Sequence, residues 1–309
     1  MPTLNSLWLL SFVFMLHGAG AGQGAAVETR ADSFKDCTHC PEMVVVPGGT
    51  FLFGSPLDEE GRDQDEGPAV DVALESFAVS RFEITLSQFQ SFADATNYQS
   101  QTPCFHTGES GRWDPHLGAT WQAPGFEQSG QHPVVCVSWD DAQQYIAWIN
   151  QQADSNDYRL LTEAEWEYSA EAGSKGPYWW GEDQADFCTY TNGADQMAAE
   201  RYPDWNRAGA CNDHHLYTAP VGYYQQSNAF GLYDLVGNVW EWVGDCYKDH
   251  LTDDYYDHEQ GMAHSCEKRV VRGGGWDYGP LYLRTSYRGA WNPAHGFTNF
   301  GFRIAKTLK

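Results

Sequence analysis

Apolar residues gather in a few short stretches of this chain, and these stretches predict strands. Residues 43–46 (Met-Val-Val-Val) are followed by a Pro-Gly-Gly turn and by Thr50 and Phe51, which is typical of two strands joined by a turn. Residues 77–84 and 132–137 are also rich in β-branched and aromatic residues. We therefore expect short β-rich segments separated by polar connections.

Three other stretches carry the start signals and apolar spacing of helices. Thr85, Ser138 and Thr162 are each followed three residues later by a residue that can complete a capping box. After the second of these caps, one helical face is formed by Ala142, Tyr145, Ile146 and Ile149. A few helices among many short strands and long connections predict an α+β domain.

Two polar stretches have neither a helical nor a strand period. Residues 58–66 are mostly acidic and indicate a solvated loop, whereas residues 100–131 predict a long loop rich in Gly, Trp, Pro and Gln. Long loops in compact domains often carry function. Because we find no internal repeat and no linker after residue 42, we expect a single domain over residues 43–307, preceded by a short tether at residues 27–42.

The chain begins with an apolar run that is typical of a secretory signal peptide. The run LWLLSFVFML occupies residues 7–16, and small residues follow it at residues 19–21 and 24–26. It is too short to span a bilayer comfortably, and no cysteine for lipid attachment lies in the cleavage region. The sequence therefore predicts a signal peptide over residues 1–26, a periplasmic or secreted protein, and no membrane anchor after cleavage.

The charge of the chain excludes two classes of partner. Asp and Glu number 42 against 18 Lys and Arg, which gives a net charge of −24. Nucleic acids and anionic membranes bind positively charged surfaces, so neither is expected as a partner. The acidity suits an exported protein and cation binding, but a soluble, self-repelling surface is the better explanation of most of it. The sequence does not fix the oligomeric state.

The eight cysteines, an even number, fit an oxidising compartment. Cys37 and Cys40 form a Cys-x-x-Cys pair. Without a second such pair or a neighbouring βαβ pattern, a structural disulfide, with each other or with distant partners, is a better interpretation than a redox or metal site. Cys246 and Cys266 bracket an acidic, Tyr-rich insertion and are expected to close its base. The other expected pairs are Cys104–Cys136 and Cys188–Cys211.

Two strings in the sequence are specific to one protein family. RLLTEAEWEY at residues 159–168 and GLYDLVGNVWEW at residues 231–242 resemble signatures of the formylglycine-generating enzyme family, the sulfatase-modifying factors. Further blocks that resemble the family are residues 43–55, 77–85, 132–148 and 271–303. The resemblance implies a C-type-lectin-like FGE-sulfatase fold with little regular secondary structure, few helices and short antiparallel strands.

The family carries two calcium sites, and the resemblance implies both in this chain. The first would use side-chain or carbonyl oxygens of Asn192, Gly193, Asp213 and His215. The second would use those of Asp234, Gly237, Val239 and Glu241. Ca²⁺ prefers such mixtures of carboxylate, amide and backbone oxygens. The alternative is that these polar residues cap turns without a metal.

The same alignment removes the active-site cysteines of the family. Starting from Gly273 and Gly274, the two catalytic cysteines fall at Tyr278 and Leu283, and a serine of the active site falls at Gly275. The family's copper chemistry needs two thiolates, because soft ligands hold Cu(I), and neither tyrosine nor leucine supplies one. The resemblance therefore implies a branch without formylglycine-generating activity.

Polar and aromatic residues remain in the family's substrate cleft. Those that we expect to contact a ligand are Tyr278, Tyr282, Arg284 and Asn299, whereas Trp276 and Arg303 are expected to be structural. Trp, Tyr and Arg often dominate binding surfaces. We therefore expect a peptide, a protein or a small molecule as the ligand of this C-terminal cleft.

Two functions fit a cleft without thiols. The first is an exported oxidoreductase of maturation type, similar to the pyoverdine-maturation members of the family, with iron or copper as an open question. The second is a non-catalytic, calcium-stabilised binding module for a peptide, protein or glycan. An iron site of two histidines and a carboxylate would draw on His214, His215, His250, His258, His264 or His295, although their spacing gives no signal. The predicted export favours the first function.

Overall fold

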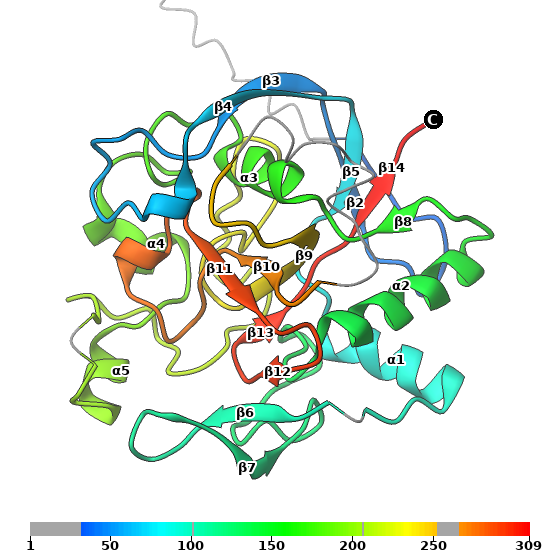
Figure 1. Cartoon of the computed structure of the whole chain (residues 1–309). Helices are drawn as coiled ribbons and strands as arrows, with labels where there is room; N and C mark the ends of the chain where they lie inside the picture. Colours follow the sequence, from blue (N-terminus) through cyan, green and yellow to red (C-terminus); the bar gives the residue numbers. More distant parts are fainter. Residues whose placement is uncertain (1–31, 101, 206, 252–265) are drawn as a thin grey trace, which may run out of the picture. The chain divides into compact units, whose positions relative to one another are not determined.

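Short strands form four separate sheets in the computed structural model, which describes residues 32–100, 102–205, 207–251 and 266–309 (Figure 1). The largest sheet has the order β1 (Ser33–Phe34), β2 (Met43–Val46), β5 (Phe77–Ser80), β14 (Ala305–Thr307) and β8 (Tyr158–Arg159), and all its pairs are antiparallel. The predicted signal peptide lies outside the described residues. Within the expected tether at residues 27–42, Ser33 and Phe34 form β1, which pairs with β2 inside this sheet.

The second sheet carries the C-terminal family block. Its order is β11 (Arg288–Trp291), β10 (Arg269–Arg272), β9 (Trp240–Cys246) and β13 (Phe300–Gly301). The β9–β10–β11 pairs are antiparallel, whereas β13 runs parallel to β9. After β10 and β11 the chain therefore comes back to β9. This return places residues 273–299 beside the GLYDLVGNVWEW segment.

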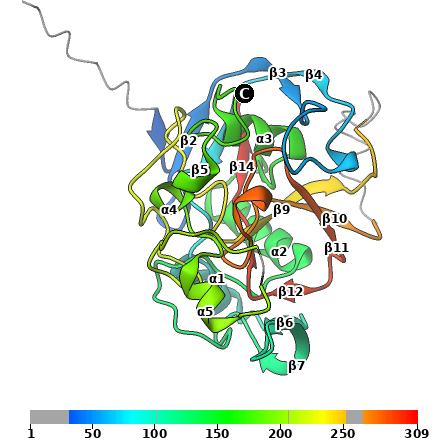
Figure 2. The ribbon, with the colours of Figure 1, turned by 90° about the vertical axis from the view of Figure 1, so that its left-hand side faces the viewer.

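Two hairpins complete the strand structure. One consists of β3 (Gly49–Phe53) and β4 (Val70–Leu74), and the other of β6 (Cys104–Thr107) and β7 (Trp113–Ala119) with β12 (Gly296–Phe297) beside β6. Figures 1 and 2 place the two hairpins at opposite ends of the unit formed by residues 31–309. The prediction of a long loop over residues 100–131 is wrong for residues 104–119, which form the β6–β7 hairpin.

The three predicted helices are confirmed, and each begins at its expected cap. The elements are α1 (Leu86–Thr96), α2 (Trp139–Gln152) and α3 (Glu163–Glu171), with short helices α4 (Phe187–Tyr190) and α5 (Gln196–Arg201) and 3₁₀ turns η1 (Gln64–Glu66), η2 (Gln184–Asp186) and η4 (Pro280–Tyr282). Thr85, Ser138 and Thr162 each form a complete capping box. Two free N–H groups at each of these helix starts thereby gain partners within a few residues.

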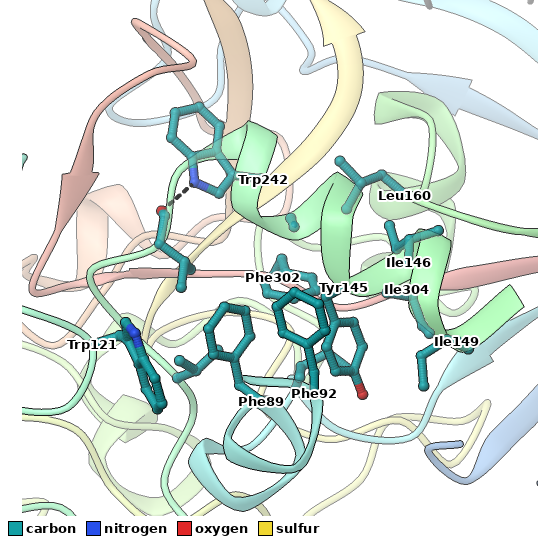
Figure 3. Packing of buried hydrophobic residues seen from close by; sticks show 14 of the residues in the cluster. Phe89, Phe92, Trp121, Tyr145, Ile146, Ile149, Leu160, Trp242, Phe302 and Ile304 are labelled. Carbon is teal, nitrogen blue, oxygen red and sulfur yellow. Dashed lines mark hydrogen bonds between the residues drawn. The ribbon is translucent and has the colours of Figure 1, made fainter. Parts of the chain in front are cut away.

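Aromatic side chains from α1 and α2 form the centre of the largest apolar cluster (Figure 3). Phe89 of α1 stacks on Tyr145 of α2 with ring centroids 6.0 Å apart, and Trp121 meets Phe89 edge-on at 5.2 Å. The indole of Trp242 donates a 3.0 Å hydrogen bond to the Val137 carbonyl. Val137 belongs to the predicted strand 132–137, which forms only an isolated bridge, between Pro133 and Thr85, and whose residues 134–137 are buried.

The three expected disulfides are confirmed, and Cys37 and Cys40, whose partners the sequence left open, are bonded to each other, which gives four disulfides. They join Cys37 to Cys40, Cys104 to Cys136, Cys188 to Cys211 and Cys246 to Cys266. These pairs account for all eight cysteines of the chain, so no free thiol remains. In the part of the chain that the structure describes, no helix has the length and apolar character needed to cross a membrane.

Candidate functional site

The candidate site lies where the polypeptide leaves β10 and meets the GLYDLVGNVWEW segment. Gly273 and Gly274 have φ angles of +96° and +71°, and a Cβ on Gly273 would lie 2.7 Å from the Leu235 carbonyl oxygen. A glycine is therefore needed there. The Gly273 carbonyl accepts a hydrogen bond from the Gly237 N–H at 2.8 Å, and the Trp276 N–H donates to Asn238 at 3.0 Å. These bonds fix the turn that carries residues 275–278.

Tyrosine and leucine fill the two positions that align with the family's cysteines. The Tyr278 ring meets Trp240 edge-on at 5.2 Å and Tyr282 at 5.5 Å, and it is partly exposed. Leu283 is fully buried in an apolar cluster and packs close to Gly193. Burial raises the pKa of the Tyr278 hydroxyl above its usual value, with the nearby charge of Asp277 adding to the effect. The tyrosine is therefore a neutral group at physiological pH.

A buried carboxyl group lies beside these rings, and the sequence analysis did not identify it. Asp277 is 1 % exposed, and its Oδ1 accepts a 2.7 Å hydrogen bond from the Asn299 amide nitrogen. Its Oδ2 and the Asn299 Oδ1 are both buried and have no hydrogen-bond partner among the described residues. Burial raises the pKa of Asp277 to about 6, although the charge of Arg207 and the Asn299 bond oppose the rise.

Arg207 supplies the positive charge of this region. Its guanidinium carbon lies 4.4 Å from the ring centroid of Tyr278 and 5.4 Å from that of Trp205, which are cation–π distances. The Tyr282 ring lies at 5.9 Å from the same carbon. Arg207 is partly exposed, whereas Asp277 and Asn299 are buried. We call these six residues, from Trp205 to Asn299, the Asp277 site.

Arg284 belongs to a different environment from the one we expected. It is 1 % exposed, and its guanidinium donates hydrogen bonds to both oxygens of Glu66, to Glu59 and, at 2.7 Å, to the Gly61 carbonyl. These contacts engage the whole donor face, so Arg284 ties the acidic loop to the C-terminal block instead of facing a ligand. A sequence reading gives no signal for this pairing, because the partners lie 218 residues apart.

The two residues expected to be structural have that environment. Trp276 is fully buried, and its indole donates to the Thr298 carbonyl at 3.1 Å. Arg303 is also fully buried and forms a 2.8 Å ion pair with Glu241. Both side chains therefore hold the turn and β13 in place beside β9.

The residues of the first expected calcium site lie together. Asp213 is fully buried, and its carboxylate accepts 2.9 Å hydrogen bonds from the Gly193 and His215 N–H groups. Burial raises the pKa of Asp213 to about 7, which those two bonds only partly offset. The Asn192 Oδ1 is buried without a hydrogen-bond partner. An oxygen that lacks a donor and a carboxylate that resists ionisation both suit a cation as the missing partner.

The second expected site holds more negative than positive charge. Asp234 is buried, and burial raises its pKa to about 6. Glu241 pairs with Arg303, and Glu83 is buried nearby with its Oε1 unpartnered. The carboxyl groups of Asp234, Glu241 and Glu83 thus share the single guanidinium of Arg303. Glu83 was not predicted from the sequence. Gly237 and Val239 lie in the adjoining turn, where the left-handed φ angles of Asp234 and Gly237 redirect the backbone.

The structure gives no support to an iron site built from histidines. Among residues 32–100, 102–205, 207–251 and 266–309, no three His, Cys, Asp or Glu side chains are arranged to hold a metal ion. His214 and His250 are exposed, and His295 packs on Phe105 in the β6–β12 region. His258 and His264 lie outside the described residues. The imidazole Nε2 of His215 is buried without a partner, but the Asp277 site contains no histidine.

A comparison with known protein families covers all of the site residues described above. The family model for the Sulfatase-modifying factor enzyme 1-like domain matches residues 29–308. The chain belongs to the FGE-sulfatase family. Its few helices and short, mostly antiparallel strands are the fold of that family.

Relatives within the FGE-sulfatase family include active and inactive enzymes. The chain is 31 % identical to the mouse protein "Inactive C-alpha-formylglycine-generating enzyme 2", over 86 % of each chain. It is also 31 % identical to a formylglycine-generating enzyme of Streptomyces coelicolor, over 85 % of this chain and 88 % of that enzyme. Similarity to both classes leaves activity to be decided by the site residues.

A solved structure of the FGE-sulfatase family is similar over nearly its whole length. PvdO from Pseudomonas aeruginosa is 34 % identical, with a TM-score of 0.73, and the alignment covers 90 % of this chain and 98 % of PvdO. The Treponema denticola variable protein 1 has the same fold at 19 % identity and a TM-score of 0.64. Within this family the present chain is a member without the cysteine pair, because every one of its thiols is bonded to another.

Proposed function

We propose that this protein is an exported oxidoreductase of maturation type that works without formylglycine-generating chemistry. The observation that carries the proposal is the absence of free thiols. All eight cysteines form disulfides, and Tyr278 and Leu283 stand where the resemblance to the family implies the two catalytic cysteines. Cu(I) held by two thiolates is therefore absent from this chain's chemistry. Any reaction must use the groups that remain.

The groups that remain suit proton transfer beside aromatic rings. Asp277 is a buried carboxyl group whose raised pKa lies close to neutral pH, and Asn299 fixes its orientation. A perturbed carboxyl group among convergent polar and aromatic side chains is a common mark of an active site. The 34 % identity to PvdO over most of both chains supports a maturation role over sulfatase modification.

Export is supported by the disulfides and by the apolar run at residues 7–16. Disulfides persist in the periplasm and outside the cell and are rare in the cytosol. We propose calcium as a structural cofactor at the two sites described above, where the charge of a divalent cation would balance buried carboxylates. The calcium ions would hold the turn at residues 234–241 and would take no part in the chemistry.

The proposal is tested in two stages. First, the purified protein with added copper should form no aldehyde on a Cys-x-Pro-x-Arg peptide, with an active formylglycine-generating enzyme as the positive control. Second, the gene is deleted in the source organism, and exported small molecules and peptides are compared by mass spectrometry. We expect a precursor to accumulate that carries two more hydrogen atoms than the mature product, and the purified protein should convert it while oxygen is consumed.

An unchanged set of exported molecules after deletion would contradict the enzyme proposal. So would aldehyde formation on the peptide, because it would place formylglycine chemistry in a chain without free thiols.

A non-catalytic binding module is the second candidate. The observation that favours it is the 31 % identity to the mouse protein named as an inactive formylglycine-generating enzyme. Such a module would bind a peptide, protein or small molecule through Tyr278 and Tyr282 and would leave it chemically unchanged. An exported molecule that binds the purified protein and is recovered with the same mass would decide for this function.

A further inference from the structure

Asp277 and Asn299 contain two buried oxygen atoms that have no partner. Asp277 Oδ2 and Asn299 Oδ1 lie in side chains joined by the 2.7 Å bond between Asn299 Nδ2 and Asp277 Oδ1. Asp277 is 1 % exposed and Asn299 is fully buried. Buried polar atoms are nearly always hydrogen-bonded, and a native exception needs an explanation. Here both atoms are acceptors, so what they lack is a donor.

The nearest positive charge does not supply that donor. The charge of Arg207 acts on Asp277, but among the described residues the two side chains form no ion pair within 4.0 Å. The guanidinium instead lies over the Tyr278 ring, with Trp205 and Tyr282 as its next aromatic neighbours. A group placed between Arg207 and Asp277 would meet a proton acceptor on one side and a positive charge on the other.

We infer that Asp277 is the proton acceptor of this site, and that Arg207 stabilises the anion formed from a planar ligand with a weakly acidic O–H or N–H group. The inference rests on the proposed function and names its ligand class. In the step, the ligand O–H or N–H bond breaks, the proton bonds to Asp277 Oδ2, and the electron pair stays on the ligand. The new negative charge then faces the Arg207 guanidinium. No electron donor or acceptor is needed for this step.

The surroundings support both halves of this assignment. The rings of Trp205, Tyr278 and Tyr282 favour a planar partner, because aromatic groups pack in offset and edge-to-face arrangements. A general base is most efficient when its pKa lies near the working pH, and burial brings Asp277 toward that range. Asn299 has a positioning role, since its amide leaves Oδ2 free as the acceptor. Entry requires the partly exposed side chain of Arg207 to shift.

The other titratable groups near Asp277 are tyrosines that stay neutral. Burial raises the pKa of Tyr278 and of Tyr202, and in both cases the charge of Asp277 adds to the rise. Tyr202 donates to or accepts from Tyr217 at 3.2 Å and is buried. The charge balance between pH 5 and pH 9 therefore depends on Asp277 and Arg207.

The test uses 4-nitrophenol as the probe, because its ionised form absorbs visible light and its neutral form does not. The full-length mature protein is titrated into the probe at a pH where most free probe is neutral. We expect the wild type to ionise the bound probe, lowering its apparent pKa by about one unit, a tenfold change in the ionisation equilibrium. Asp277→Asn should abolish the visible band, and Arg207→Gln should weaken it by about tenfold.

Controls separate proton transfer from binding and from misfolding. The probe 4-nitroanisole has no acidic proton to transfer to Asp277. Its affinities for the wild type and for Asp277→Asn should therefore agree within about twofold. Asp204→Asn, an exposed change three residues from Arg207, should leave the visible band unchanged. Arg207→Gln alters a partly exposed side chain, so it keeps the test informative if Asp277→Asn fails to fold.

Three results would overturn the inference: an undiminished visible band in Asp277→Asn, an undiminished band in Arg207→Gln, or no binding of 4-nitrophenol by the wild type. These results are separable from failure of the proposed function. If the deletion strain still accumulates a precursor that the wild-type protein converts, the oxidoreductase proposal stands and only the Asp277 assignment is lost. If no precursor accumulates but the probe is ionised, the proton acceptor stands within a binding module.

Discussion

Arg284 and Asp277 are buried polar residues of the same C-terminal stretch, residues 271–303, and they differ in how completely they are paired. Arg284 is surrounded by Glu59, Glu66 and a backbone carbonyl, and its charge is matched on every side. Asp277 has a single hydrogen-bonded side-chain partner, Asn299, and one oxygen with none. The side chains of Arg284 and Asp277 are both buried, so burial alone does not distinguish a structural residue from a functional one. The pairing does.

Because the two residues are paired differently, the loss of Arg284 and the loss of the Asp277 carboxyl group should change stability differently. Removing a member of a fully paired network leaves another charge buried without compensation, which is strongly destabilising. Removing an unpaired carboxyl group relieves a cost that the folded protein already carries. Stability is therefore expected to fall in the first case and to rise in the second, while only the second change removes function.

The largest effect is expected from Arg284→Met. Burial raises the pKa of Glu66, but the hydrogen bonds and charge of Arg284 outweigh it and hold that pKa below its usual value. Without the guanidinium, Glu66 is a buried, unpaired carboxylate, and the free energy of unfolding should fall by about 3–5 kcal/mol. Urea denaturation at pH 7.5 measures the change.

Two further variants check this explanation. Arg112→Ala, at an exposed arginine, should change stability by less than about 0.5 kcal/mol. The double variant Arg284→Met with Glu66→Gln should recover part of the loss, because it leaves no charge at Glu66 unpaired. Equal losses in the single and double variants would show that packing, and not charge pairing, explains the effect.

Calcium should produce a smaller effect than Arg284→Met, because at the second expected site the buried carboxyl groups of Asp234 and Glu241 have, among the described residues, only one guanidinium, that of Arg303, to balance them. A cation that binds only the folded state at one hundred times its Kd adds about 2.7 kcal/mol to stability. We expect thermal unfolding in calcium to occur at a higher temperature than in EGTA. Asp234→Ala should reduce that difference, whereas the exposed Asp186→Asn should not. Identical unfolding curves with and without calcium would refute the metal assignment.

Asp277→Asn should stabilise the protein at pH 8. The folded-state pKa of about 6 lies above the roughly 3.9 of an unfolded aspartate, so the folded state holds the proton more tightly. The stability contributed by protonated Asp277 is present below about pH 4 and is lost as the pH rises to about 6. The variant avoids that loss and should gain up to about 3 kcal/mol at pH 8, with little gain at pH 4. Denaturation curves at both pH values measure this, and a pH-independent difference would argue against the shifted pKa.

The smallest effect is expected at Gly275, the position at which the resemblance implies a serine in the active enzymes. A Cβ there would lie 3.4 Å from Asn299 Cβ and from Asp277 Oδ1, which is an ordinary contact. Gly275→Ser should therefore change stability by less than about 0.5 kcal/mol. At Gly274, with φ +71° and a Cβ that would lie 2.6 Å from a Leu283 methyl group, the same change should cost at least about 1 kcal/mol. Equal costs at the two positions would show that the turn is not held as described.

Local features of the sequence predicted local structure well. The three capping boxes predicted where α1, α2 and α3 begin, because the interacting groups lie within three residues of each other. The structure confirmed the expected pairs Cys104–Cys136, Cys188–Cys211 and Cys246–Cys266, and it decided the pairing of Cys37 with Cys40, which the sequence had left open. The strand predicted at residues 132–137 formed only an isolated bridge. The pattern of its residues fits a strand and also fits a buried segment without a strand ladder, and periodicity does not distinguish the two.

The candidate site was predicted only in part. Tyr278, Tyr282 and Asn299 do lie around one site, as the family alignment suggested. Arg284 was misplaced because its partners come from the loop at residues 58–66, which a sequence reading treats as solvated. Asp277 and Arg207 were missed because neither the charge nor the spacing of a single aspartate or arginine shows whether it is buried or paired.

The sequence by itself determined the family, the helix starts and the absence of the catalytic cysteines, because each of these depends on residue identity at fixed positions. Only the tertiary structure decided which charges are satisfied. Arg284 with Glu66 and Asp277 with Asn299 pair residues 218 and 22 positions apart, and their protonation depends on the solvent that the folded chain excludes. Charge pairing in a protein interior depends on three-dimensional proximity and burial, which no single stretch of sequence encodes.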